Sequence, residues 1–151
     1  MSRAVLRNRF GIYLHVPFCS KKCDYCSFAT WTDRDHLVED YLQACKAQAR
    51  EAASSISSIS SVFIGGGTPN LVPVQLLMDI FDGLPLHPNA EFTVECNPDH
   101  VTADDLGIYV DHGVNRISLG VQSMVPHVLG SLGREHNPDT VSYTHLRAHE
   151  T

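Results

Sequence analysis

Four short runs of apolar, β-forming residues are spaced along the chain. They are Ile12–Val16, Ser61–Ile64, Glu91–Cys96 and Arg116–Val121. Each run is four to six residues long and contains Val, Ile or Phe, a pattern that is typical of strands and too short for a helix. The pattern therefore predicts four β-strands.

The longer segments between these runs carry apolar residues at helical spacing. Asp35 to Ala53 places Leu37, Tyr41 and Cys45 on one face of a predicted amphipathic helix. The other predicted helices are Val74–Phe81, Thr102–His112 and a fourth that starts near Pro126. Strands and helices therefore alternate along the chain.

Capping signals mark the ends of two of these helices. Asp33 or Asp35 is expected to cap the first helix, because a short acceptor side chain there satisfies free backbone N–H groups. Thr102 is expected to cap the third helix, with Asp105 in the capping-box position and Gly113 as its stop.

The alternation predicts an α/β fold of parallel β-α units with right-handed crossovers. In such folds the loops at the carboxyl ends of the strands converge on one face, where ligands bind. Distinctive residues mark the end of every predicted strand: a cysteine loop follows the first, Gly65–Gly67 follow the second, Glu95 closes the third and Gln122 closes the fourth. We therefore expect a single site at this edge, with His15 packed under the cysteine loop.

Three of the five cysteines share one loop, with the spacing Cys-x3-Cys-x2-Cys at Cys19, Cys23 and Cys26. An odd, clustered set suits reduced thiols and metal binding better than a disulfide framework. Iron–sulfur ligation, structural zinc and a redox pair at Cys23 and Cys26 are all open on spacing alone. Three thiolates on a four-iron cluster would leave one iron free for chemistry. Cys45 and Cys96 are expected to be small core residues.

Composition narrows the class of protein. The chain has 151 residues, 43% of them hydrophobic and 19% charged, which suits one globular domain. Its formal net charge of −6 and the lack of a basic cluster argue against nucleic-acid binding. No apolar run has the length of a transmembrane segment, and the first ten residues lack the apolar centre of a signal peptide. We therefore expect a cytoplasmic protein.

Five motifs together resemble the radical S-adenosylmethionine (SAM) proteins related to oxygen-independent coproporphyrinogen III oxidase, and within them the subfamily of HemW-like heme chaperones. The motifs are Tyr13–Cys19 with the cysteine triplet, Gly65–Pro69, Glu95–Pro98, Gly120–Gln122 and Gly133–His136. The resemblance implies an incomplete parallel (β/α) barrel of the radical SAM type, with about four β-α units present.

The resemblance also implies a set of ligands and cofactors. Cys19, Cys23 and Cys26 would ligate a [4Fe-4S] cluster, with SAM bound to the open iron. The implied SAM contacts are Tyr13, Tyr25, Gly66, Gly67, Thr68, Glu95, Gln122 and Arg134. Each of these has a structural alternative, such as a tight turn for the glycines, core packing for the tyrosines and a solvated surface position for the charged residues.

Phe28 bears on what the protein does with these cofactors. The oxidases carry a further cysteine two residues after the third ligand, whereas HemW-like members carry phenylalanine, and this chain reads Cys26-Ser27-Phe28. The resemblance thus implies a heme chaperone that passes heme to an acceptor protein and takes electrons from a donor. The alternative is an oxidoreductase of the coproporphyrinogen dehydrogenase type or a related radical methyl transferase.

The resemblance covers residues 11–141, which we expect to be the N-terminal part of a radical SAM core domain. Residues 1–10 are expected to be a lead-in. Residues 142–151 do not resemble the family, and we expect a foreign tail on a truncated chain that folds poorly by itself; a natural terminus of a divergent short protein is the alternative.

Overall fold

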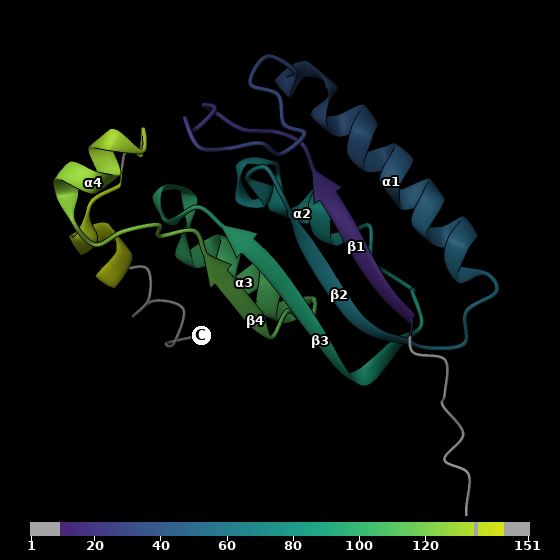
Figure 1. Ribbon diagram of the computed structural model, residues 1–151. Coiled ribbons are helices and arrows are strands. Elements are labelled where there is room, and N and C mark those ends of the chain that lie inside the picture. The colour runs from purple at the N-terminus through teal and green to yellow at the C-terminus, as the bar shows by residue number, and fades with distance from the viewer. Residues whose placement is uncertain (1–9, 135, 144–151) are drawn as a thin grey trace, which may run out of the picture.

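Four parallel strands form one sheet in the order β1–β2–β3–β4, so each strand pairs with its neighbour in sequence. The structure is a computed structural model that describes residues 10–134 and 136–143. The strands are β1 (Phe10–Val16), β2 (Ile59–Gly66), β3 (Leu86–Cys96) and β4 (Arg116–Leu119). Their arrowheads all point toward the same edge of the sheet (Figure 1).

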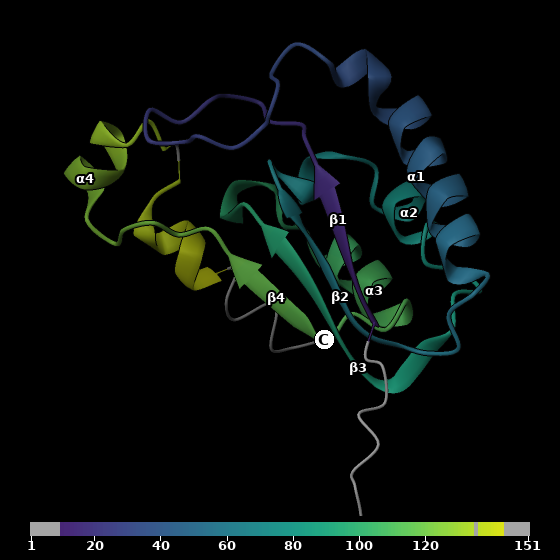
Figure 2. The same ribbon diagram turned by 45° about the vertical axis from the view of Figure 1, so that its right-hand side comes forward.

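Helices connect the strands, as the alternating pattern predicted. They are α1 (Val38–Ala53), α2 (Val74–Met78), α3 (Ala103–Asp111) and α4 (Pro126–Ser131). Short 3-10 turns precede α1, α2 and α3 at Asp35–Leu37, Pro69–Leu71 and Pro98–His100. Both views place α4 beyond the arrowheads, near the loop that follows β1 (Figures 1 and 2).

The core lies between the sheet and the helices α1, α2 and α3. Alternate residues of each central strand are buried there, because successive side chains of a strand point to opposite faces. Fully buried members include Val16, Ile59, Val62, Ile64, Phe92 and Val94 from strands and Leu42, Leu77, Met78 and Tyr109 from helices, and Leu106 of α3 is buried beside them. Phe81 meets Phe92 edge-to-face at 4.9 Å between ring centroids, which adds to this packing.

The opposite face of the sheet carries a different set of side chains. Tyr13, Phe63 and Thr93 occupy paired positions on three adjacent strands. The rings of Tyr13 and Phe63 lie 6.1 Å apart, and the Tyr13 side chain is 59% exposed. Exposed and polar side chains on this face contrast with the buried, mostly apolar core on the other.

Several expected boundaries were wrong by a few residues. β2 and β3 are longer than predicted, and β4 ends at Leu119, so Gln122 lies in the loop beyond the strand and does not close it. Neither Asp33 nor Asp35 caps α1, because a 3-10 turn begins at Asp35 and Leu37 takes the capping position without a side-chain bond. The second helix ends at Met78, before the predicted Phe81.

Other local predictions are confirmed. The Thr102 hydroxyl accepts the Asp105 backbone N–H at 3.1 Å and donates to the Asp105 carboxylate at 2.7 Å. Gly113 follows α3 with φ of +85°, a left-handed conformation that glycine adopts without strain. Cys96 is buried, and Cys45 is half-buried against the core.

No helix within the described residues combines the length and the apolar character that a membrane span requires.

Candidate metal and cofactor site

A cavity of about 410 Å³ opens at the carboxyl ends of the strands. Its size falls in the range of pockets that hold small-molecule ligands or cofactors. The wall carries all three clustered cysteines together with residues from the other strand ends. These are Gly66, Gly67 and Thr68 at the end of β2, Glu95 and Asn97 around the end of β3, and Gly120 and Gln122 after β4. Residues that are far apart in the sequence thus meet at one cavity, as expected for the carboxyl ends of parallel strands.

The cysteine loop is closed at its base by backbone hydrogen bonds. The Cys19 N–H donates to the Trp31 carbonyl at 3.1 Å, and the Trp31 N–H donates to the Pro17 carbonyl at 2.8 Å. Phe18 is buried beneath the loop and meets Tyr41 edge-to-face at 5.5 Å. All three cysteines of this loop are free thiols of intermediate exposure.

His15 supports the same loop from β1, as predicted. Its Nε2–H donates to the Ala29 carbonyl at 2.9 Å, which leaves Nδ1 to accept the Tyr13 hydroxyl at 3.1 Å. Tyr13 does not line the cavity, although the sequence placed it among the candidate SAM contacts. Burial and the nearby Glu95 carboxylate raise the pKa of Tyr13 above its ordinary value, so its hydroxyl stays protonated and able to donate.

The glycine-rich end of β2 is bonded directly to the cysteine loop. The Gly67 N–H donates to the Val16 carbonyl at 2.7 Å, and the Thr68 N–H donates to the Phe18 carbonyl at 2.8 Å. A Cβ at Gly67 would lie 2.6 Å from the Phe18 oxygen and 2.9 Å from the Cys19 sulfur. Only glycine permits this approach of the two segments.

Two side chains donate hydrogen bonds to cysteine sulfurs. The Thr68 hydroxyl donates to Cys19 Sγ at 3.7 Å, and the Arg134 guanidinium donates to Cys23 Sγ at 3.8 Å. Two of the three clustered sulfurs thus have a side-chain donor directed at them from outside the cysteine loop. Tyr25 lines the cavity beside Cys23. The pKa of its hydroxyl is raised, mainly because the group is partly buried and next because the Cys23 sulfur lies beside it.

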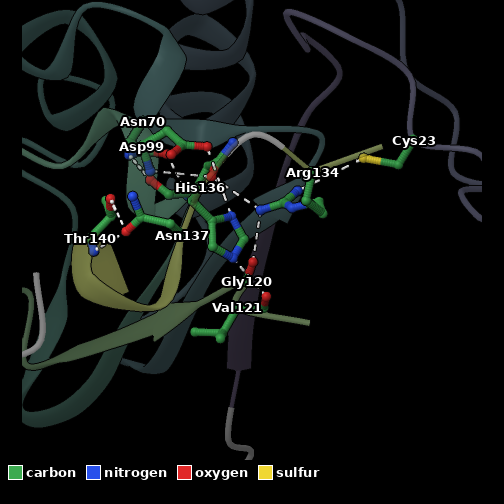
Figure 3. Close-up of polar contacts among 10 residues, drawn as sticks. Cys23, Asn70, Asp99, Gly120, Val121, Arg134, His136, Asn137 and Thr140 are labelled. Carbon is green, nitrogen blue, oxygen red and sulfur yellow. Dashed lines mark hydrogen bonds and ion pairs between the residues drawn. The ribbon is translucent and has the colours of Figure 1, made fainter. Parts of the chain in front are cut away.

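Arg134 is held by residues from two strand ends. Its second terminal nitrogen donates to the Gly120 carbonyl at 2.7 Å and to Asn97 Oδ1 at 3.1 Å. Figure 3 shows the guanidinium between Gly120 and the Cys23 sulfur. Its Nε is buried without a hydrogen-bond partner among the described protein atoms.

His136 lies beside Arg134 and contacts the loops that follow β3 and β4 (Figure 3). Its Nε2–H donates to the Val121 carbonyl at 2.8 Å, and its Nδ1 lies 3.8 Å from the Asp99 carboxylate. Gln122 follows Val121 with φ of +63°, and among the described residues it alone, apart from glycines, has a positive φ. A strained backbone of this kind persists only where the surroundings enforce it, and such positions cluster at binding sites.

Glu95 lies over the glycine strand end on the sheet face that the helices leave uncovered. A Cβ at Gly65 would come within 2.6 Å of the Glu95 Oε2, so the missing side chain makes room for the carboxylate. Asn97 and Asn70 then join the ends of β3 and β2, because Asn70 donates to the Asn97 carbonyl at 3.0 Å and accepts its N–H at 2.8 Å.

The donor set fits an iron–sulfur cluster better than one metal ion. A tetrahedral zinc site with Zn–S bonds of about 2.3 Å needs sulfurs about 3.8 Å apart. Among the described residues, the three that bring metal-binding atoms within 4.8 Å of one another are Asp79, Asp82 and His112, at the ends of α2 and α3, and not the cysteines. Sulfurs spread more widely suit a cluster in which each thiolate binds a different iron.

The structure therefore gathers ten of the eleven candidate residues around one cavity and leaves Tyr13 outside its wall. Sequence reasoning missed Asn97 and His136 as parts of this site, although both lie in motifs that were recognised. Asn97 follows β3 by one residue, so the strand-end rule could have found it. No periodic signal marks His136, which reaches the site from beyond α4.

Comparisons with known proteins agree with this geometry. The profile of the radical SAM superfamily matches residues 13–151. The chain is 39% identical over 142 residues to the heme chaperone HemW of Escherichia coli, and the match covers 85% of this chain and 36% of the relative. It is 33% identical over 133 residues to the oxygen-independent coproporphyrinogen III oxidase of Paracoccus denitrificans, covering 83% of this chain and 30% of the relative.

A solved structure shows the same fold. Coproporphyrinogen III oxidase (HemN) from Escherichia coli, described as a radical SAM enzyme, superposes with a TM-score of 0.83 at 27% identity. The match covers 94% of this chain and 34% of that one, so the open four-stranded sheet corresponds to part of a radical SAM (β/α) barrel. The chain spans about a third of the length of the relatives it matches.

Proposed function

This chain belongs to the radical SAM superfamily, and we propose from that membership that Cys19, Cys23 and Cys26 hold a [4Fe-4S] cluster in the cavity with SAM beside it. The observation that carries the proposal is the convergence of three free thiols and two sulfur-directed donors on one cavity. When bound and reduced, such a cluster supplies the electron that cleaves SAM.

The side chains of the cavity have distinct proposed tasks toward SAM. The backbone of Gly66 and Gly67 admits the methionine portion without interference from a Cβ. Glu95 accepts hydrogen bonds from hydroxyl or amino groups, and the Gln122 amide both donates and accepts. Arg134 places a positive charge beside the cavity for a carboxylate group of SAM, and Tyr25 closes the wall beside Cys23.

We propose further that a protein containing this chain is a heme chaperone in the cytoplasm, which binds heme, passes it to an acceptor protein and receives electrons from a donor. Two observations support the proposal: the relatives named as HemW chaperones, and Phe28. Phe28 is 63% exposed and lines the cavity two residues after Cys26, where an oxidase would place a thiol. An aromatic ring supplies neither a ligand nor a redox group, which disfavours the alternative of a coproporphyrinogen III oxidase.

The cluster is tested first, by anaerobic reconstitution with iron and sulfide of a protein of the relatives' length that contains this chain. We expect about four irons per chain and visible charge-transfer absorption in the wild type and in the control Cys45→Ala, because Cys45 lies on α1 outside the cavity. Cys23→Ala should lose both signals. Unchanged iron content and absorption in Cys23→Ala would overturn the ligand assignment.

Chaperone and oxidase are then separated in a protein of the relatives' length that contains this chain. A chaperone binds heme stoichiometrically and leaves coproporphyrinogen III unchanged in the presence of SAM and a reductant. An oxidase decarboxylates the porphyrinogen with release of 5′-deoxyadenosine. Porphyrinogen turnover by the reconstituted protein would therefore refute the chaperone proposal and leave the cluster assignment standing.

A further inference from the structure

We propose that Thr68 and Arg134 set the reduction potential of the bound cluster by donating hydrogen bonds to the sulfurs of Cys19 and Cys23. The inference rests on the proposed cluster site and adds a task that is independent of SAM binding. It concerns the protein's own side chains, which reach two of the three ligand sulfurs from separate segments 49 and 111 residues away in sequence.

Thr68 is a fixed donor. Its backbone N–H is bonded to the Phe18 carbonyl at 2.8 Å, one residue before Cys19, so threonine and cysteine move together. The hydroxyl then lies 3.7 Å from Cys19 Sγ and is part-buried. Since sulfur is larger than oxygen, hydrogen bonds to it are longer than those to a carbonyl.

Arg134 is fixed on the other side of the cavity. The nitrogen that does not face Cys23 is bonded to the Gly120 carbonyl and to Asn97 Oδ1, which orients the planar guanidinium (Figure 3). The remaining terminal nitrogen is directed at Cys23 Sγ at 3.8 Å. Arg134 therefore presents a permanent positive charge to one ligand, whereas Thr68 presents a neutral dipole to another.

Both donors stabilise the reduced cluster more than the oxidised one. Reduction adds one electron, and part of the added negative charge resides on the cysteine sulfurs. A hydrogen bond to sulfur, or a positive charge beside it, gains strength as that negative charge grows, so each donor raises the reduction potential. The effect is greatest where water is excluded, because the surrounding dielectric constant is then low.

The test is a redox titration of reconstituted protein followed by electron paramagnetic resonance, without SAM. Thr68→Val keeps the β-branched shape and removes the hydroxyl, while Thr68→Ser keeps the hydroxyl and is the matched control. We expect Thr68→Val to disfavour reduction about tenfold, which is about 59 mV to lower potential for one electron. Thr68→Ser should titrate with the wild type, and Arg134→Gln should shift further in the same direction because it also removes a charge.

Equal potentials for the wild type and a fully loaded Thr68→Val would overturn the inference. If Thr68→Val takes up fewer irons than the wild type, Thr68→Ala is compared instead, since it also lacks the hydroxyl and is smaller, and the same criterion applies. The measurements distinguish a failure of the proposed cluster site from a failure of the proposed tuning of its potential. A wild-type chain that takes up no cluster refutes the proposed function, whereas loaded variants with equal potentials refute only the tuning.

Discussion

Replacing Gly67 with alanine should disrupt the cysteine loop, because the new methyl group has no space. The ideal Cβ would lie 2.6 Å from the Phe18 oxygen, 2.9 Å from Cys19 Sγ and 2.9 Å from the Val16 oxygen. Two of these three neighbours are backbone atoms of β1 and its extension, which cannot move without breaking the contact of β1 with β2. The substitution therefore forces the two segments apart.

The size of the effect follows from two contributions. Forcing a methyl group into a closely packed site costs about 1–3 kcal/mol. Separating the segments also weakens the Gly67 N–H bond to the Val16 carbonyl, now 2.7 Å, at about 1 kcal/mol. We therefore expect Gly67→Ala to lower the free energy of unfolding by about 2–4 kcal/mol, a large share of the about 5–15 kcal/mol typical of a domain.

Gly107 provides a matched control in the same chain. It lies inside α3, no heavy atom falls within 4 Å of its ideal Cβ, and its φ is not left-handed. Alanine there should raise the free energy of unfolding by about 0.5–1 kcal/mol, because glycine loses more conformational freedom in a helix. The same chemical change is thus expected to have opposite signs at the two positions.

The assay is urea unfolding of the two apo variants and the wild type, followed by iron content after reconstitution. Gly67→Ala should also lose cluster, because the methyl group displaces Cys19, whereas Gly107→Ala should load as the wild type does. A Gly67→Ala protein with wild-type stability and full iron content would refute the reasoning that close approach of β2 to the cysteine loop builds the site.

Two further predictions concern the cavity wall. Gln122→Gly should raise the free energy of unfolding, measured in urea, by about 0.5–1 kcal/mol, because it relieves about 1–2 kcal/mol of left-handed strain and this gain exceeds the entropy cost of glycine. The same change should weaken SAM binding, because it removes the amide side chain. A lower stability of Gln122→Gly would contradict the assignment of strain. Burial raises the pKa of the Cys96 thiol from 9.0 to about 12, so above about pH 9 the unfolded thiol ionises while the folded one does not, and stability falls as pH rises toward 12. Cys96→Ala should lose less stability than the wild type between about pH 8 and about pH 11, and an equal loss measured by urea unfolding would contradict the assignment.

The fold was predictable because its signals are local. Alternating burial in β1 to β3 and helical spacing in α1 and α3 depend on residues a few positions apart, and the parallel order then followed from the alternation. Boundaries were less predictable because strand ends depend on pairing. β3 starts at Leu86, before the apolar run, since Leu86 pairs with Ile59 of the neighbouring strand.

The site, like the fold, was predictable from the sequence only in part. The meeting of the cysteine loop, Gly66–Thr68 and Glu95 was predictable, because the direction of a parallel strand fixes the edge of the sheet at which its loop emerges. The contacts of Arg134 and His136 were not predictable from the pattern, since they come from the segment after α4 and depend on how it returns to the cavity. Gln122 was expected at a strand end, and its left-handed backbone has no signature in the sequence.

The metal preference of the cysteine motif is a property of the tertiary structure. Spacing fixes how far apart three cysteines lie along the chain, but zinc and iron–sulfur ligation differ in how far apart the sulfurs lie in space. That spread depends on contacts outside the loop: Gly67 and Thr68 hold Cys19 from β2, and Arg134 reaches Cys23 from beyond β4. The loop alone would therefore leave the choice of metal undetermined, and the glycine-rich strand end is as much part of the cluster site as the cysteines are.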